Sequence, residues 1–314
     1  MPAHAAQTVG YTTAGLLIAA TLLLVVGPDR ASALVGPAAS PSAAAPSAAS
    51  PSAASPSAAS PSAASPSPVA DSTTPSKPGS SSASASASAK KAAPYRVVGL
   101  GDSVPAGNAC GCTTYVDLVG RQAANRQGTT ADVSNLAQGG LTTPGLLDQL
   151  KDGSVKKKIA AADLVIITIG ANDFDTGSVG SSSCAGLYCF QSTLKQQKSQ
   201  LDEVFDRVEG LLDPDATVLV TGYWNVFLDG DVAATRGAGY VRNSVALTRA
   251  ENDQIEATAE QNGATYVDIF TPFKGSSGTR NDTSLLAADG DHPNAAGHRK
   301  IAATLAAALS RLMP

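Results

Sequence analysis

Histidine is scarce in this 314-residue sequence, which contains only His4, His292 and His298. Any reaction that needs an imidazole near neutral pH must therefore use one of these three side chains. His4 precedes an apolar leader, so two candidates remain in the part of the chain that we expect to fold.

Basic and aromatic residues are also few. The chain has 22 Lys and Arg against 26 Asp and Glu, and 6 Phe, 7 Tyr and 1 Trp. Residues 1–93 contain four of the cations and two of the anions, which leaves residues 94–314 with 18 against 24, or −6. An acidic domain without a basic stripe argues against nucleic acid as a partner.

The N-terminus resembles an export signal. Residues 8–27 carry no charge, and the apolar run Ala14–Val26 is 13 residues long, short for a membrane span of about 20. A small-x-small cleavage pattern follows at 31–33, although no Lys or Arg precedes the run. We therefore predict a signal peptide over residues 1–33, with an uncleaved membrane anchor as the alternative.

Residues 34–93 are dominated by Ser, Ala and Pro and include repeats of the type SPSAA. Proline every five residues forbids a continuous helix, and the segment has too little apolar surface to fold. We predict a disordered linker, either a passive spacer or a stalk through a cell wall, with a reach on the order of 190 Å. The remaining residues, 94–314, are enough for one well-cored domain.

The four cysteines, Cys110, Cys112, Cys184 and Cys189, all lie in this domain. An even number in a chain that looks exported predicts disulfides and a secreted or cell-surface location, and three pairings are possible. Metal ligation by Cys110 and Cys112 is a weaker alternative, because zinc motifs usually space cysteines more widely.

The folded part alternates apolar, β-branched runs with longer helical patterns. Five βα repeats indicate an α/β domain of three layers, α/β/α, around a five-stranded parallel sheet. In this architecture sites form beyond the carboxyl ends of the strands. The predicted strands are 96–100, 131–136, 164–169, 217–221 and 265–269, and the predicted helices are 114–126, 144–150, 194–212, 241–262 and 293–312.

Polar residues follow three of these strands. Ser103 follows the first strand, the glycine pair that ends at Gly140 follows the second, and Asn172 follows the third. A serine can act as a nucleophile, while a backbone N–H and a neutral amide can stabilise an oxyanion. Each residue also has an ordinary structural interpretation as a turn or a helix cap.

The loop after the fifth strand contains Asp289 and His292. Asp289 can accept from one ring nitrogen, which leaves the other to take a proton from serine. We place Pro293 in the first turn of the last helix, with His292 directly before the helix. Capping by Asp289 or Asp291 and a metal cluster with His298 are the alternatives. His298 lies six residues further on and points elsewhere, so we expect it to be structural.

In this order the motifs resemble the SGNH (GDSL-type) hydrolase family, over essentially all of residues 94–314. GDSVPAG matches the first block of the family, Gly140 the second-block glycine, GAND the third block and DGDHPN the last. One departure is Leu141, where many members have Asp. The resemblance implies a flavodoxin-like fold and a catalytic triad of Ser103, Asp289 and His292. It also implies an oxyanion hole made by the N–H groups of Ser103 and Gly140 and by the Asn172 side chain. Neither a cofactor nor a metal is required.

The substrate is less well defined. Nine of the 14 aromatics follow strands on the expected site side, and we predict a partly apolar pocket that includes Phe174, Tyr223 and Trp224. A small-molecule or carbohydrate ester with a short acyl or acetyl group is the expected substrate, cleaved through an acyl-enzyme by a monomer. The alternatives are a lipase or lysophospholipase, an acyltransferase, and a non-catalytic cell-wall binding module.

Overall fold

The computed structural model describes residues 92–181, 184, 186–225 and 227–313. The predicted signal peptide or anchor, and all but the last two residues of the predicted linker, lie outside the described residues. Within the described ranges, no helix is both long and apolar enough to cross a membrane.

The strands form one parallel sheet in the order β2-β1-β3-β4-β5, which confirms the predicted α/β fold. The chain passes from β1 outward to β2 and then returns to β3 on the other side of β1, so the topological switch point lies between β1 and β3. The strands are β1 (Tyr95–Gly101), β2 (Ala131–Asn135), β3 (Leu164–Thr168), β4 (Thr217–Thr221) and β5 (Thr265–Val267).

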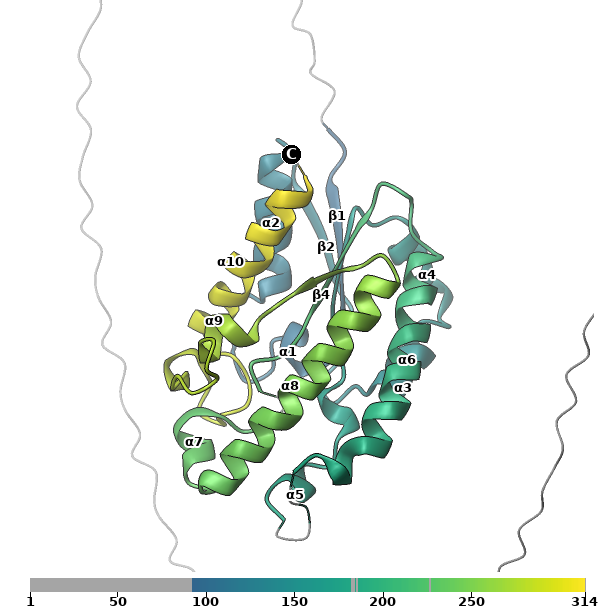
Figure 1. Cartoon of the computed structure of the whole chain (residues 1–314). Helices are drawn as coiled ribbons and strands as arrows, with labels where there is room; N and C mark the ends of the chain where they lie inside the picture. Colours follow the sequence, from purple (N-terminus) through teal and green to yellow (C-terminus); the bar gives the residue numbers. More distant parts are fainter. Residues whose placement is uncertain (1–91, 182–183, 185, 226, 314) are drawn as a thin grey trace, which may run out of the picture. The chain divides into compact units, whose positions relative to one another are not determined.

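Helices cover both faces of the sheet (Figure 1). One face is covered by α2 (Tyr115–Arg126) and α10 (Ala295–Leu312), which pack together. The other is covered by α3 (Thr143–Gln149), α6 (Gln191–Glu209) and α8 (Ala238–Gln261). The shorter elements are α1 (Ser103–Ala106), α4 (Gly153–Ala160), η1 (Ala171–Asp173), α5 (Thr176–Val179), η2 (Tyr188–Phe190), α7 (Gly230–Ala234), α9 (Phe270–Lys274) and η3 (Thr283–Leu285).

The buried centre of the sheet fixes the residues that follow the carboxyl ends of its strands. All five residues of β3 are buried, as expected for an apolar strand with helices on both faces. Gly101, the last residue of β1, has φ 125°, and a Cβ there would lie 1.8 Å from the Thr168 carbonyl oxygen. Only glycine lets β1 run this close to β3, and this contact fixes the position of the residues that follow.

The start of the last helix differs from the prediction. α10 begins at Ala295, and its cap is Asn294, whose side chain accepts from the N–H groups of Ala296 and Gly297. Pro293 therefore precedes the cap and forms an isolated antiparallel bridge with Leu286. Neither Asp289 nor Asp291 caps the helix. The sequence prediction was wrong here because the Asn294 side chain is the better-placed acceptor for the first N–H groups of the helix.

The cysteines pair as Cys110–Cys112 and Cys184–Cys189. A ring nitrogen of His298 lies within 4.8 Å of the Cys110 and Cys112 sulfurs, but the disulfide occupies both thiols. His298 is fully buried, stacks on Tyr115 and accepts from its backbone N–H through Nδ1 at 3.2 Å. The structural role expected for His298 fits this position.

Candidate active site

Ser103 lies directly after β1, at the switch point. Asp102 caps the short helix α1, because its Oδ1 accepts from Val104 N at 2.9 Å. Ser103 is then the first residue of α1, a position whose N–H has no partner within the helix. The serine therefore presents its hydroxyl to the crevice, and its N–H meets no acceptor in the described part of the chain.

Asp102 itself is a feature that the sequence did not reveal. Its carboxyl group is buried, and its Oδ2 accepts from the Tyr223 hydroxyl. Burial raises the pKa of Asp102 to about 7, although the hydrogen bonds from Tyr223 and Val104 oppose this rise. A buried carboxyl group with a raised pKa thus supports the turn that carries Ser103.

The two other predicted oxyanion donors lie in neighbouring loops. Gly140 has φ 76°, a left-handed conformation that favours glycine, and its N–H meets no acceptor among the described residues. Asn172 donates from Nδ2 to the Leu141 carbonyl oxygen at 3.0 Å. Since an amide carries two N–H donors, one remains for a ligand. Because the acceptor is a backbone carbonyl, this contact does not depend on the Leu141 side chain.

A network behind Asn172 joins these two loops. Asp173 accepts from Thr143 N at 2.8 Å and from Thr143 Oγ1 at 2.5 Å, which ties η1 to the start of α3. Gln197 donates to Asp173 Oδ2 and to the Gly170 carbonyl oxygen, each at 3.0 Å. It also lies 3.1 Å from Glu251 Oε1, and burial raises the pKa of Glu251 well above its ordinary value.

The Asp289–His292 pair forms as predicted. His292 Nδ1 lies 2.8 Å from Asp289 Oδ2, while Asp289 Oδ1 accepts from the N–H groups of Asp291 and His292. Partial burial opposes ionisation, but these hydrogen bonds outweigh it and hold the pKa of Asp289 below its ordinary value. Asp289 is therefore ionised and orients the imidazole. The structure shows no hydrogen bond between the described side chains of Ser103 and His292, a link that often tightens only with substrate bound.

A buried ionic cluster supports this loop. Asp229 N donates to the Gly290 carbonyl oxygen at 2.6 Å, and Lys274 Nζ pairs with the carboxylates of Asp229 and Asp282. All three charged residues are buried. Burial, reinforced by the neighbouring Asp229, raises the pKa of Asp282 to about 7. The sequence gave no signal for this cluster, because its members come from three separate segments.

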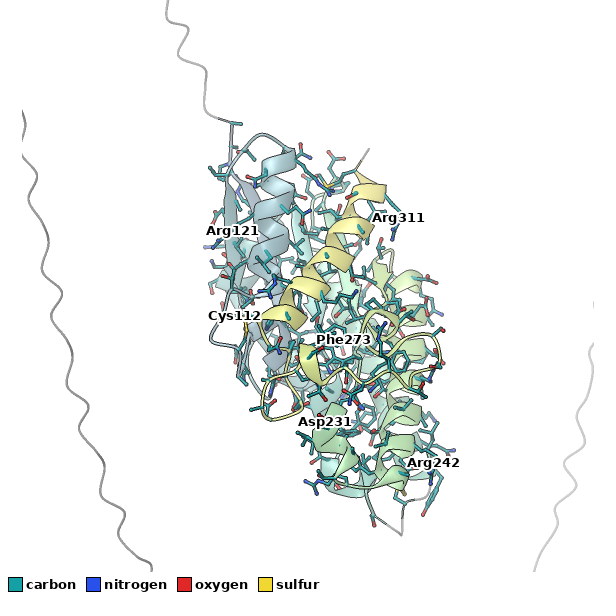
Figure 2. The ribbon with its side chains drawn as sticks, turned by 90° about the vertical axis from the view of Figure 1, so that its left-hand side faces the viewer. Cys112, Arg121, Asp231, Arg242, Phe273 and Arg311 are labelled. Atoms are coloured by element: carbon teal, nitrogen blue, oxygen red, sulfur yellow. A yellow bond between two sulfur atoms is a disulfide. The ribbon has the colours of Figure 1, made fainter. Side chains whose placement is uncertain are left out.

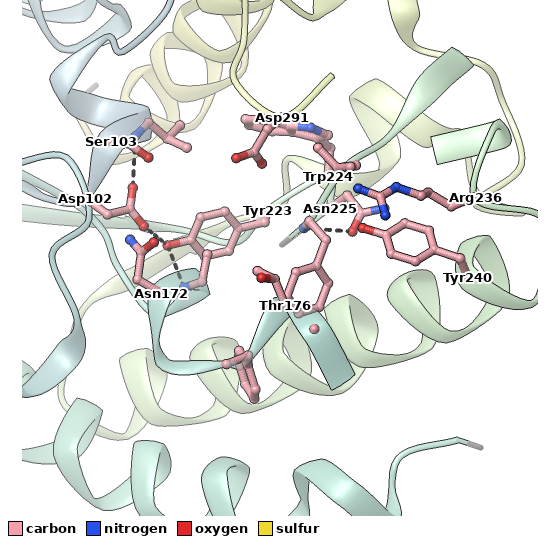
Figure 3. A pocket seen from close by; sticks show the side chains of 16 residues that line it. Asp102, Ser103, Asn172, Thr176, Tyr223, Trp224, Asn225, Arg236, Tyr240 and Asp291 are labelled. Carbon is pink, nitrogen blue, oxygen red and sulfur yellow. Dashed lines mark hydrogen bonds between the residues drawn. The ribbon is translucent and has the colours of Figure 1, made fainter. Parts of the chain in front are cut away.

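Ser103 and Asn172 line one pocket of about 400 Å³ (Figure 3). The predicted pocket residues Phe174, Tyr223 and Trp224 also line it. The aromatic prediction was too broad, however. Four of the nine residues are not part of the lining: Tyr188 is 58% exposed, Phe190 packs edge-on against Phe174, Phe273 stacks on Trp224, and Phe270 lies under Arg249. Tyr240 does line the pocket, from α8 rather than from a loop.

Comparisons with known proteins agree with this geometry. The model of the GDSL-like Lipase/Acylhydrolase family matches residues 100–300. The chain belongs to this family. GDSL-type enzymes are carboxylic ester hydrolases, and this chain is an enzyme of that class.

Individual relatives of this GDSL hydrolase are distant. It is 26% identical over 181 residues to the uncharacterized protein YpmR of Bacillus subtilis (strain 168), a match that covers 57% of this chain and 66% of the relative, just under two thirds. The lipase Lip_vut3 from a goat rumen metagenome shares the fold with a TM-score of 0.54 and 18% identity, over 68% of this chain and 97% of the lipase. Phospholipase A1 from Streptomyces albidoflavus NA297 matches with a TM-score of 0.49 and 23% identity, over 70% and 99%.

Proposed function

We propose that the protein is an exported serine esterase that cleaves short-chain acyl or acetyl esters through an acyl-enzyme on Ser103. The observation that carries this proposal is one pocket lined by both Ser103 and Asn172, with Asp291 of the Asp289–His292 loop on its wall. The two disulfides support export, because disulfides persist in oxidising compartments.

In this mechanism the Ser103 hydroxyl attacks the ester carbonyl while His292, oriented by Asp289, takes its proton. The N–H groups of Ser103 and Gly140 and the Asn172 amide hold the oxyanion. The acyl C–O bond then breaks, and the alcohol leaves with the proton from His292. In the second half, His292 takes a proton from water as the water attacks the acyl-enzyme. His292 then returns the proton to Ser103, and the acid is released.

The pocket is assigned to the acyl group. The alcohol departs toward His292, which protonates it, but His292 is not among the described residues that line the pocket. The aromatic wall of the pocket (Phe174, Tyr223, Trp224, Phe227 and Tyr240) suits an apolar chain, and the pocket volume of about 400 Å³ lies in the range of small-molecule sites.

The test uses Ser103→Ala and 4-nitrophenyl esters. The variant should fold normally, lose hydrolysis of 4-nitrophenyl acetate and lose labelling by a fluorophosphonate probe. Unchanged turnover or labelling would exclude Ser103 as the nucleophile, and an unlabelled wild-type protein would favour a non-catalytic module. Across acyl lengths we expect the highest kcat/KM below C10, and an optimum at C10 or longer would indicate a lipase.

A further inference from the structure

The pocket has two ends of different charge. Figure 3 shows Asp102 and Ser103 at one end and Arg236 and Tyr240 at the other, with Asp291 between them on one wall. Arg236 is the sole cation among the described residues that line the pocket. An acyl chain attached at Ser103 and running along the pocket therefore extends away from Asp102, past Asp291, and toward a guanidinium.

The Arg236 guanidinium has no partner in the described part of the chain, neither an ion pair nor a hydrogen bond. Some other arginines of the domain are already engaged. Arg207 pairs with Glu203, Arg249 stacks on Phe270 with its guanidinium 4.5 Å from the ring centroid, and Arg280 donates to backbone carbonyls at the end of α9. The donors of Arg236 remain available to a ligand.

Tyr240 adds a second donor at the same end. Its hydroxyl takes a hydrogen bond from the Leu228 backbone, and burial raises its pKa, so the phenol stays neutral and retains its own hydrogen. Arg236 also lines a second hollow of about 300 Å³ with Thr176, Gly177, Gly180 and Tyr240. The pocket is thus open beyond Arg236, and an acyl chain that reaches the guanidinium has room for its end group.

We propose that Arg236 and Tyr240 form an anion subsite for the far end of the acyl group, so that the enzyme prefers esters whose acyl chain ends in a carboxylate. The guanidinium fork matches the geometry of a carboxylate, and such charge-assisted hydrogen bonds are stronger than neutral ones. This inference rests on the proposed esterase function and on the assignment of the pocket to the acyl group.

The first test compares a charged and a neutral ester of equal length in the full chain: 4-nitrophenyl hydrogen adipate and methyl 4-nitrophenyl adipate. The readout is the ratio of their kcat/KM values, corrected for spontaneous hydrolysis. Arg236→Gln should lower this ratio about tenfold, as expected for loss of a hydrogen bond to a charged group, and Arg236→Lys should lower it less. The wild-type ratio should also fall with added salt.

Arg242→Gln is the matched control, because Arg242 is an exposed arginine of the same helix as Tyr240 and lies outside the pocket (Figure 2). Its ratio should equal that of the wild type. An unchanged ratio in Arg236→Gln would overturn the subsite. An equal fall of the ratio in both variants would also overturn it, because it would indicate a general electrostatic effect of the surface charge.

The second test needs no turnover. The Ser103→Ala protein is titrated with monomethyl adipate and with dimethyl adipate, and binding is followed by NMR. The acid should bind more tightly than the diester, and the added Arg236→Gln change should abolish the difference. Equal binding of the two would overturn the subsite. A wild-type protein that hydrolyses neither ester but binds the acid selectively would instead count against the esterase function alone.

A third pair of esters tests the side of the substrate. In 4-acetoxybenzoate and its methyl ester the charge lies on the leaving group, so Arg236→Gln should leave the ratio of their kcat/KM values unchanged. If Arg236→Gln lowered the kcat/KM ratio of this pair and left the ratio of the adipates unchanged, the assignment of the pocket to the acyl group would be wrong.

Discussion

Asn172 and His292 follow β3 and β5, and the contacts that hold the two residues differ in burial and in distance along the chain. The turn of Asn172 is fixed by Asp173, which binds Thr143 30 residues earlier, and by Gln197, which bonds Glu251 54 residues later. Glu251 and Gln197 are fully or almost fully buried. The oxyanion side therefore depends on the folded core.

The direct contacts of His292 are local, although the buried cluster of Asp229, Lys274 and Asp282 supports the same loop at Gly290. Asp289, three residues from His292, is 38% exposed, and Ala287 N donates to the His292 carbonyl oxygen at 2.8 Å. Such contacts close a loop without crossing the core. The comparison implies that changes to the Asp289–His292 pair alter activity alone, whereas changes behind Asn172 alter activity and stability together.

The largest effect is expected for Asp289→Asn. The amide cannot hold the same imidazole tautomer, and kcat/KM should fall on the order of 10⁴-fold, as for the equivalent change in a serine protease triad. Thermal stability should stay near that of the wild type. Steady-state kinetics and a melting curve measure both, with the exposed Asp253→Asn as control. A loss below tenfold would show that Asp289 does not orient His292.

Asn172→Ala should lower kcat by about 10²–10³, the usual effect of removing one oxyanion donor. The melting temperature should hardly change, because Asn172 is exposed and its side chain makes one hydrogen bond, to a backbone carbonyl. A large fall in melting temperature would instead support a capping role.

Asp173→Asn tests the buried side of the comparison. An amide nitrogen would replace one of two oxygens that accept from Thr143 and Gln197, so the free energy of unfolding should fall by about 1–3 kcal/mol. We also expect kcat to fall, by less than the factor of about 10²–10³ that removal of an oxyanion donor costs, because Asn172 would be displaced rather than lost. Thr143→Ser, which keeps the hydroxyl, is the control. If the variant lost stability but kept its kcat, the contacts behind Asn172 would not be what positions this oxyanion donor.

Much of this site follows from local sequence. β3 is recognisable because an unbroken apolar run suits a strand buried on both faces, and the ends of parallel strands must meet at one edge. Ser103 and Asn172 could be placed for that reason, and Asp289 with His292 because three residues can close a hydrogen-bonded loop.

The remaining features depend on contacts between distant segments. The raised pKa of Asp102 comes from burial by segments distant in the chain, and Arg236 lines the pocket only because α7 and α8 turn the chain back toward β1. β5 ends at Val267 rather than Ile269, because the chain enters α9 there, and the β-branched run gave no sign of this.

The last expected effect concerns stability and pH. Burial raises the pKa values of Glu251, Asp102 and Asp282, so the folded state binds more protons than the unfolded state from about pH 4 to pH 7. This contribution to the free energy of unfolding is complete below the unfolded pKa values and is lost as pH rises through the folded ones. Stability should therefore fall as pH is raised across this window, by at most about 1.4 kcal/mol per pH unit for each group.

Glu251→Gln removes one of these groups but keeps an oxygen to accept from Gln197. The variant should lose less stability than the wild type between pH 5 and pH 8, as measured by denaturant unfolding at each pH. Glu260→Gln, on the exposed face of the same helix, should follow the wild type. If the free energy of unfolding of Glu251→Gln changed with pH as steeply as that of the wild type, the Glu251 carboxyl group would not take up a proton on folding. The core behind Asn172 would then contain a charge.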